Sequence, residues 1–252
     1  MKLRLVLFIF ASGALAAESP RSAKFPAALK PEKGRAVRIV LEKTAVHAIL
    51  PSGKKQRLSD YDTADVGTEA APLLVADFNF DGYDDVAVLE GNGYGGVNLF
   101  YRVWLWNSAA LEYREFPTSI SNPSLSAKNR TVVSAQRSGP RWYQTVFRAG
   151  GGELKVFLES QMLNSGTHWG VTFADGTRAV ADTQWFDGDM KARPQATGIY
   201  APGLCAGDKK SSSAQRQRVK LIDFREEGAE VLIAGEKAGS QRWISADCLA
   251  EN

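Results

Sequence analysis

Residues 77–85 read Asp77-Phe78-Asn79-Phe80-Asp81-Gly82-Tyr83-Asp84-Asp85. Oxygen-bearing side chains stand at positions 1, 3, 5 and 9 of this stretch, a glycine stands at 6, and a main-chain carbonyl is available at 7. A hard cation takes six or more oxygen ligands, and a tight loop with alternating inward side chains supplies them from one segment. The spacing predicts a Ca²⁺ loop with these ligands: Asp77, Asn79, Asp81, the carbonyl of Tyr83, and Asp85.

The loop departs from an EF-hand in two respects. Position 12 is Val88, where a sensor EF-hand has a bidentate glutamate, and Glu90 is the nearest carboxylate that would complete the shell. Short, apolar, β-branched runs flank the loop at 73–76 and 86–89, so it joins strands and not helices. A site of this kind is typically structural. The alternative is an Asx-rich turn that holds no ion.

The N-terminal residues predict secretion. Lys2 and Arg4 precede the apolar run 5–10, and the small residues Ala14 and Ala16 fit a cleavage site, so residues 1–16 read as a signal peptide. No cysteine follows the cleavage region, and no later run reaches the ~20 apolar residues of a membrane span. We therefore expect a periplasmic protein without a lipid anchor.

Charge and composition exclude some classes of partner. Removal of Lys2 and Arg4 leaves 29 basic residues from 31, against 28 acidic ones, a net charge of +1. Such a balance gives no reason to expect a nucleic-acid or anionic-membrane partner. The length suits one main domain and a smaller second one.

Strand signals dominate the rest of the chain. Residues 17–35 hold prolines and charges without apolar periodicity and read as a flexible tether. From Ala36, alternating runs are separated by turn signals such as Ser138-Gly139-Pro140, Gly150-Gly151-Gly152 and Asp175-Gly176. No window of 12 residues carries a helical stripe. We predict an all-β, antiparallel domain over 36–190, with a propeller-like or sandwich architecture.

An ordered set of motifs resembles a known family. The loop 77–89 resembles the core of FG-GAP-type calcium repeats. The span 36–159 is similar to bacterial periplasmic inhibitors of peptidoglycan hydrolases, which include immunity proteins against effectors of antibacterial type IV secretion. That family is similar in fold to the periplasmic inhibitor of invertebrate-type lysozyme. The matching pieces are the calcium loop, the glycine-rich segment 91–98, Tyr101, the run 104–107, Asn122-Pro123, and Ser138-Gly139 followed by Trp142.

The resemblance implies that the glycine-rich loop enters the active-site cleft of a lysozyme-like enzyme, a muramidase or a chitinase-like one. Glycines let a backbone approach another surface closely, and amide and phenol groups suit a cleft lined by carboxylates and aromatics. Tyr94 stands where the family would lead us to expect a small residue. The alternative is a tight bend before a core strand. The predicted contact residues are Asn92, Gly93, Tyr94, Gly95, Gly96, Asn98 and Tyr101.

The tail, 197–252, has a different character. Its ending, Gln241 to Leu249, resembles the last strands of a bacterial SH3-like barrel, whose roles include peptide binding and packing against a neighbour. Cys205 and Cys248 both lie in this tail, and in a secreted chain they predict one disulfide. Two cysteines and two distant histidines are too few for a zinc site.

Catalysis has little support in the sequence. His47 lies within a predicted strand and His168 in a predicted turn, and neither is near a nucleophile motif. We therefore expect a binding protein and not an enzyme. The alternatives are a calcium-stabilised carbohydrate-binding or peptidoglycan-binding adhesion module, and behind it a weak hydrolase.

Overall fold

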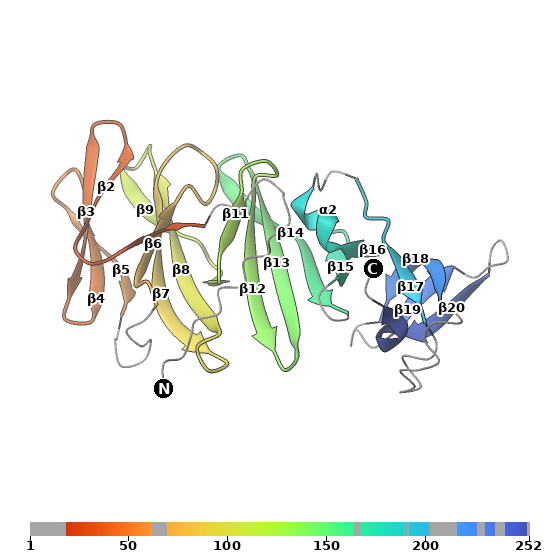
Figure 1. Cartoon of the computed structure of the whole chain (residues 1–252). Coiled ribbons are helices and arrows are strands. Elements are labelled where there is room, and N and C mark those ends of the chain that lie inside the picture. Colours follow the sequence, from red (N-terminus) through yellow and green to blue (C-terminus); the bar gives the residue numbers. More distant parts are fainter. Residues whose placement is uncertain are drawn as a thin grey trace.

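The fold is built from four antiparallel sheets, as the sequence predicts for an all-β protein (Figure 1). It is seen in a computed structural model that describes residues 19–61, 70–163, 167–188, 190, 192–201, 216–225, 230–234 and 240–250. The sheets follow one another along the molecule, and the first three pack face to face as in a sandwich. No helix among the described residues is long and apolar enough to cross a membrane. The expected signal peptide lies outside them.

The first sheet is a meander, and it corrects the predicted tether over 17–35. Its strands are β2 (Ala27–Glu32), β3 (Arg35–Glu42), β4 (Ala45–Ile49) and β5 (Lys55–Asp60). Ala27 and Leu29 are buried on the inner face of β2. Pro31 is tolerated because β2 is an edge strand, where a missing N–H breaks no ladder. The sequence did not predict this strand because Pro31 interrupts its short alternation of apolar and polar residues.

The second sheet is the central layer. It contains β1 (Arg21–Ala23), β6 (Leu73–Ala76), β7 (Asp85–Gly93), β8 (Asn98–Asn107), β9 (Glu112–Glu115) and β10 (Ile120–Ser121). The first five residues of β7 are all buried, as expected for a strand with both faces covered. One hydrophobic core joins this sheet to the first sheet and to Leu125, Val132, Phe147 and Leu154 of the third.

The third sheet follows the predicted hairpins. Its strands are β11 (Ser124–Ser126), β12 (Thr131–Ser138), β13 (Arg141–Gly150), β14 (Glu153–Met162), β15 (His168–Phe173) and β16 (Arg178–Asp182). They pair in chain order, so the three predicted turns connect neighbouring strands. The short helix α2 (Thr183–Asp187) follows, with Asp182 as its N-cap.

The tail forms a fourth sheet. Its elements are β17 (Thr197–Tyr200), β18 (Gln217–Phe224), β19 (Glu230–Ala234), β20 (Gln241–Ser245), the 3₁₀ turn η2 (Ala246–Cys248) and β21 (Leu249–Ala250). The outer strands β20 and β21 do not pair within the described residues, so the expected barrel is here an open sheet. Cys248 is buried, whereas Cys205 lies outside the described residues. Their disulfide stays a prediction.

The fourth sheet shares a hydrophobic core with the third. Leu163 and Val180 belong to the same cluster as Leu221 and Phe224. The ring of Phe224 lies against Gly170, where an added Cβ would be 2.5 Å from the ring. The guanidinium of Arg178 covers the same ring at 4.3 Å and pairs with Asp223 at 3.3 Å. The tail is therefore docked on the body of the protein.

Candidate functional site

The predicted calcium loop connects β6 to β7 and is held by its own carboxylates. Both oxygens of Asp77 accept main-chain N–H groups, from Asp81 at 2.9 Å and Gly82 at 2.8 Å. Asp81 accepts the N–H of Tyr83 at 3.1 Å. Gly82 has a φ of +94°, which a residue with a side chain rarely adopts. These interactions are those of successive Asx turns.

Asp85 is the innermost carboxylate of the loop, with none of its surface exposed. Oδ2 accepts the N–H of Phe78 at 2.8 Å and of Asn79 at 3.4 Å. Oδ1 accepts the N–H of Trp106, on β8, at 2.7 Å. Burial raises the pKa of Asp85 well above its ordinary value, against the opposing effect of the N–H groups. Burial also raises the pKa of Asp77. Ionising Asp77 and Asp85 in the folded loop therefore costs free energy when no cation is nearby.

The loop also braces the second sheet against the third. Asn79 donates from Nδ2 to the carbonyl of Gly152, in the β13–β14 turn, at 3.0 Å. Arg130, before β12, donates to the carbonyl of Phe80 at 2.9 Å. Phe80 is among the few residues with a positive φ that are not glycine. The loop thus joins two sheets, which suits a structural role.

The fit of this loop to calcium is partial. Asp77, Asn79 and Asp81 bring their oxygens to one turn, and the Asn79 amide contacts Asp81 at 2.8 Å. Within the described residues, no group of three or more acidic, histidine or cysteine side chains is arranged to hold a metal. Glu90, the carboxylate expected to complete the shell, instead pairs with Arg102 and accepts a hydrogen bond from Ser119. That the loop binds calcium thus stays a prediction.

The glycine-rich segment forms the tip of the β7–β8 hairpin. Gly93 and Asn98 are paired, so the turn consists of residues 94–97. Tyr94, Gly95 and Gly96 have φ values of +53°, +66° and +87°. The predicted bend is thus present, and it is also exposed: Tyr94 is 50% and Val97 38% exposed. Asn92 is exposed beside them. Gly93 lies within β7, close to the Phe100 ring.

A neighbouring hairpin fixes the tip. The hydroxyl of Tyr94 donates to the carbonyl of Gly139, at the β12–β13 turn, at 2.6 Å. The guanidinium of Arg137 lies 5.6 Å from the centre of the Tyr94 ring. Arg137 and Gly139 are not among the contact residues predicted from the sequence. Ser138-Gly139 predicts a turn and is part of the family resemblance, but its contact with Tyr94 is long-range and no local pattern indicates it.

Two of the predicted contact residues are structural instead. Asn98 is 6% exposed, and its amide exchanges hydrogen bonds with the main chain of Arg137 at 2.7 and 2.9 Å. Tyr101 is 3% exposed and donates its hydroxyl to the carbonyl of Ala71 at 3.2 Å. Burial raises the pKa of Tyr101 to about 12. Neither side chain is available to a partner, because both are buried.

The loop 77–85 and the hairpin tip lie at opposite ends of β7. Asp85 begins the strand and Gly93 ends it, a separation of roughly 26 Å at ~3.3 Å per residue. The loop 77–85 is therefore separate from the exposed tip at 94–97. The two are connected through β7 and also through the third sheet, which contacts the loop at Gly152 and Arg130 and the tip at Gly139.

The two histidines lie apart. His47, on β4, contacts the carbonyl of Ala45 through Nδ1 at 3.1 Å. His168 begins β15 and is fully buried, with Nε2 3.0 Å from the carbonyl of Thr197. They lie in the first and third sheets, so the structure does not bring them together.

Comparisons with known proteins give one distant likeness. No protein-family model matches this chain, and no curated protein sequence matches it. Among solved structures it is similar to one described as "Structure of a Xanthomonas Type IV Secretion System related protein", with 13% identity and a TM-score of 0.38, over 90% of this chain and 98% of that one. A likeness this distant carries no argument about activity or partner.

Proposed function

We propose that this protein is a periplasmic inhibitor of a peptidoglycan hydrolase, of the immunity type, with no chemistry of its own. One observation carries the proposal. Of the three large hydrophobic side chains that are exposed among the described residues, Tyr94 and Val97 lie together at the β7–β8 tip. Exposed apolar groups on a fixed tip are typical of a surface that enters a partner. The sequence resemblance supplies the class of partner.

The bracing of the tip favours tight binding. Tyr94 is tied to Gly139, and Asn122 accepts the N–H of Leu99 at 3.2 Å and donates to the carbonyls of Val97 and Ala135 at 3.0 Å. A tip that is already ordered loses less conformational entropy when it enters a cleft. A lysozyme-like cleft lined by carboxylates also accepts the Tyr94 ring and the Arg137 guanidinium that stacks on it.

We expect Val97→Glu to weaken inhibition at least thirtyfold, because a charge at the tip would be buried against the enzyme. The inhibition constant is measured against a panel of purified muramidases. The matched control is Val156→Glu, which adds the same charge at an exposed valine on β14. Both variants should keep the thermal midpoint of the wild type. Equal inhibition by the two variants would place the interface elsewhere.

Incubating the protein with cell walls, alongside the inhibition assay, distinguishes the two alternative functions. A carbohydrate-binding or peptidoglycan-binding module would sediment with cell walls and leave the muramidases active. A weak hydrolase would release soluble fragments from the walls. Either result without inhibition of any muramidase contradicts the inhibitor proposal.

We further propose that the loop 77–85 binds Ca²⁺ through Asp77, Asn79, Asp81, the carbonyl of Tyr83, and Asp85. Carboxylate oxygens can accept more than one interaction, so their bonds to N–H groups leave capacity for a cation. The ion would offset the repulsion among the three carboxylates and the cost of burying Asp85. Its role would be structural.

Calcium should raise the thermal midpoint, and Asp81→Ala should remove the rise. A ligand at 100 times its dissociation constant stabilises a fold by ~2.7 kcal/mol. Because the loop is far from the tip, chelation should leave the inhibition constant unchanged at temperatures where the protein is folded. Scanning calorimetry in chelator and in millimolar calcium tests the first point, and identical midpoints would exclude the calcium site.

A further inference from the structure

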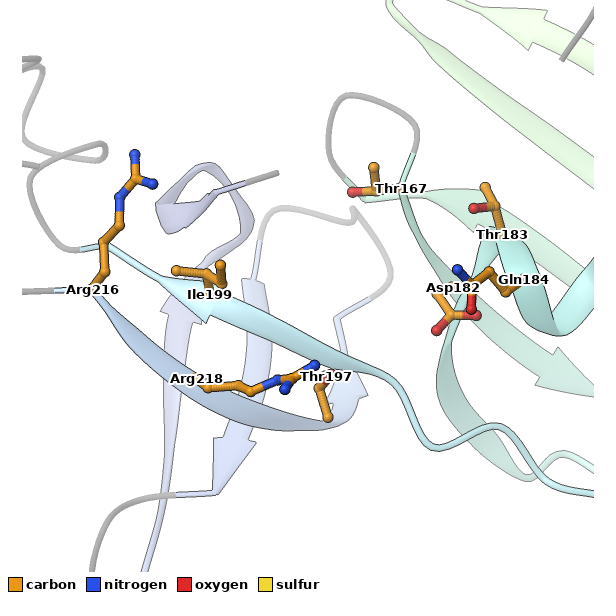
Figure 2. Close-up of a pocket in the computed structure, with 8 residues that line it drawn as sticks. All are labelled: Thr167, Asp182, Thr183, Gln184, Thr197, Ile199, Arg216 and Arg218. Atoms are coloured by element: carbon orange, nitrogen blue, oxygen red, sulfur yellow. The ribbon is translucent and has the colours of Figure 1, made fainter. Parts of the chain in front are cut away.

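A cleft lies where the fourth sheet meets the body of the protein (Figure 2). One wall comes from the β15–β16–α2 region and the other from β17 and β18. Its volume is about 670 Å³, within the ~300–1,000 Å³ usual for ligand sites. It is lined by Thr167, Asp182, Thr183, Gln184, Thr197, Ile199, Arg216 and Arg218.

Interactions across the junction hold the two walls in place. His168 lies 3.1 Å from Thr167 Oγ1 through Nδ1 and 3.0 Å from the carbonyl of Thr197 through Nε2. A carbonyl only accepts, so Nε2 carries the hydrogen in the neutral ring, and Nδ1 accepts from the hydroxyl. Thr167 and Thr197 belong to opposite walls. Together with the docked ring of Phe224, this bridge gives the cleft a fixed shape.

The two walls carry opposite charges. Arg216 and Arg218 are exposed on one side, and neither forms an ion pair with a described residue. Asp182 lies on the other wall, with Oδ1 accepting the N–H of Trp185 at 2.9 Å, and the Arg218 side chain extends toward that wall (Figure 2). Between these charges the lining offers three threonine hydroxyls, the Gln184 amide and the apolar Ile199.

We propose that this cleft binds a short peptide that carries both a carboxylate and an amine. A guanidinium matches a carboxylate with two parallel hydrogen bonds, which suits Arg216 and Arg218. Asp182 suits an ammonium group, and the hydroxyls and the Gln184 amide suit peptide bonds. A polyanion fits less well, because Asp182 would repel it. This site goes beyond the proposed inhibition, since none of its residues lies at the hairpin tip.

The probe is the tetrapeptide Ala-Glu-Lys-Ala with free termini, titrated into the full chain by calorimetry. We expect saturable binding with a dissociation constant below ~1 mM. Replacing the glutamate by glutamine and amidating the C-terminus should weaken it at least tenfold, because the arginines then lose their carboxylate partner. Acetylating both amines should also weaken binding, through the loss of the contact with Asp182.

Two variants locate the site. Arg218→Gln should weaken binding of the tetrapeptide about tenfold, the loss of one charge-assisted pair. Arg242→Gln is the matched control, because Arg242 stacks on Tyr200 in the same sheet, at 4.7 Å, and does not line the cleft. It should leave the affinity unchanged, and both variants should still inhibit the hydrolase as the wild type does.

Three outcomes would overturn the proposal. The first is no saturable binding at millimolar tetrapeptide. The second is equal loss of affinity in Arg218→Gln and Arg242→Gln. The third is binding of heparin or polyphosphate that is tighter than binding of the peptide and falls steeply with salt, which would make the cleft a polyanion site.

Discussion

Replacing Asp85 by alanine should destabilise the protein by about 3–5 kcal/mol. The substitution leaves the N–H groups of Phe78, Asn79 and Trp106 without their acceptor in a site that water does not reach. Each buried donor without a partner costs ~1–3 kcal/mol. Urea denaturation in the presence of a chelator measures the loss apart from any contribution of calcium.

The control for this prediction is the neighbouring residue. Asp84→Ala removes a carboxylate that is 42% exposed and 4.0 Å from Arg21. Exposed pairs of this kind contribute ~0–1 kcal/mol. Asp85→Asn should fall between the two alanine variants, because it keeps one oxygen acceptor. Equal losses in the free energy of unfolding for Asp84→Ala and Asp85→Ala would show that the hydrogen bonds of Asp85 do not stabilise the contact between the loop and β8.

The second large effect concerns the docking of the tail. Gly170→Ala places a Cβ 2.5 Å from the Phe224 ring, where both are held between strands. Overpacking of this kind costs ~1–3 kcal/mol, and the strain should displace the fourth sheet from the third. We expect a lower midpoint of thermal unfolding and faster tryptic cleavage between the body and the tail.

Two further variants make this test specific. Gly150→Ala, in the same sheet, adds a Cβ with no heavy atom within 4 Å and should leave the midpoint unchanged. Phe224→Ala removes the ring at a cost of ~3–5 kcal/mol. In that background Gly170→Ala should cost little more, because the clash is gone. Additive losses in the double variant would show that Gly170 and Phe224 do not meet.

The distance between the loop 77–85 and the tip 94–97 predicts how a change in one affects the other. Asp85 lies at one end of β7 and the tip at 94–97 follows its other end, so a defect in the loop 77–85 should reach the proposed inhibitory surface mainly through unfolding. If the loop binds Ca²⁺ as proposed, loss of the ion should lower the amount of folded protein and not the affinity of the folded fraction for the proposed partner. This distinguishes a structural ion from one that contacts the partner.

Local patterns carried much of the fold prediction. The hairpins at 138–140, 150–152 and 175–176 were visible because turn residues and strand alternation depend on neighbours in the chain. The Asx turns of 77–85 and the bend at 94–97 were visible for the same reason. The prediction failed for β2, where Pro31 and few apolar residues masked an edge strand. Tyr101 was also misplaced, since its sequence position near the glycines did not reveal the face of β8 on which it lies.

The sequence by itself determined the all-β class, the turn chemistry of the loop and the exposed bend, because each is set by interactions within about ten residues. Only the tertiary structure decided which of these groups are buried and which meet. The Asp85 contact with Trp106, the Tyr94 contact with Gly139 and the docking of Phe224 on Gly170 join residues 21 to 54 positions apart. Such pairings depend on how whole sheets pack, and no local pattern encodes them.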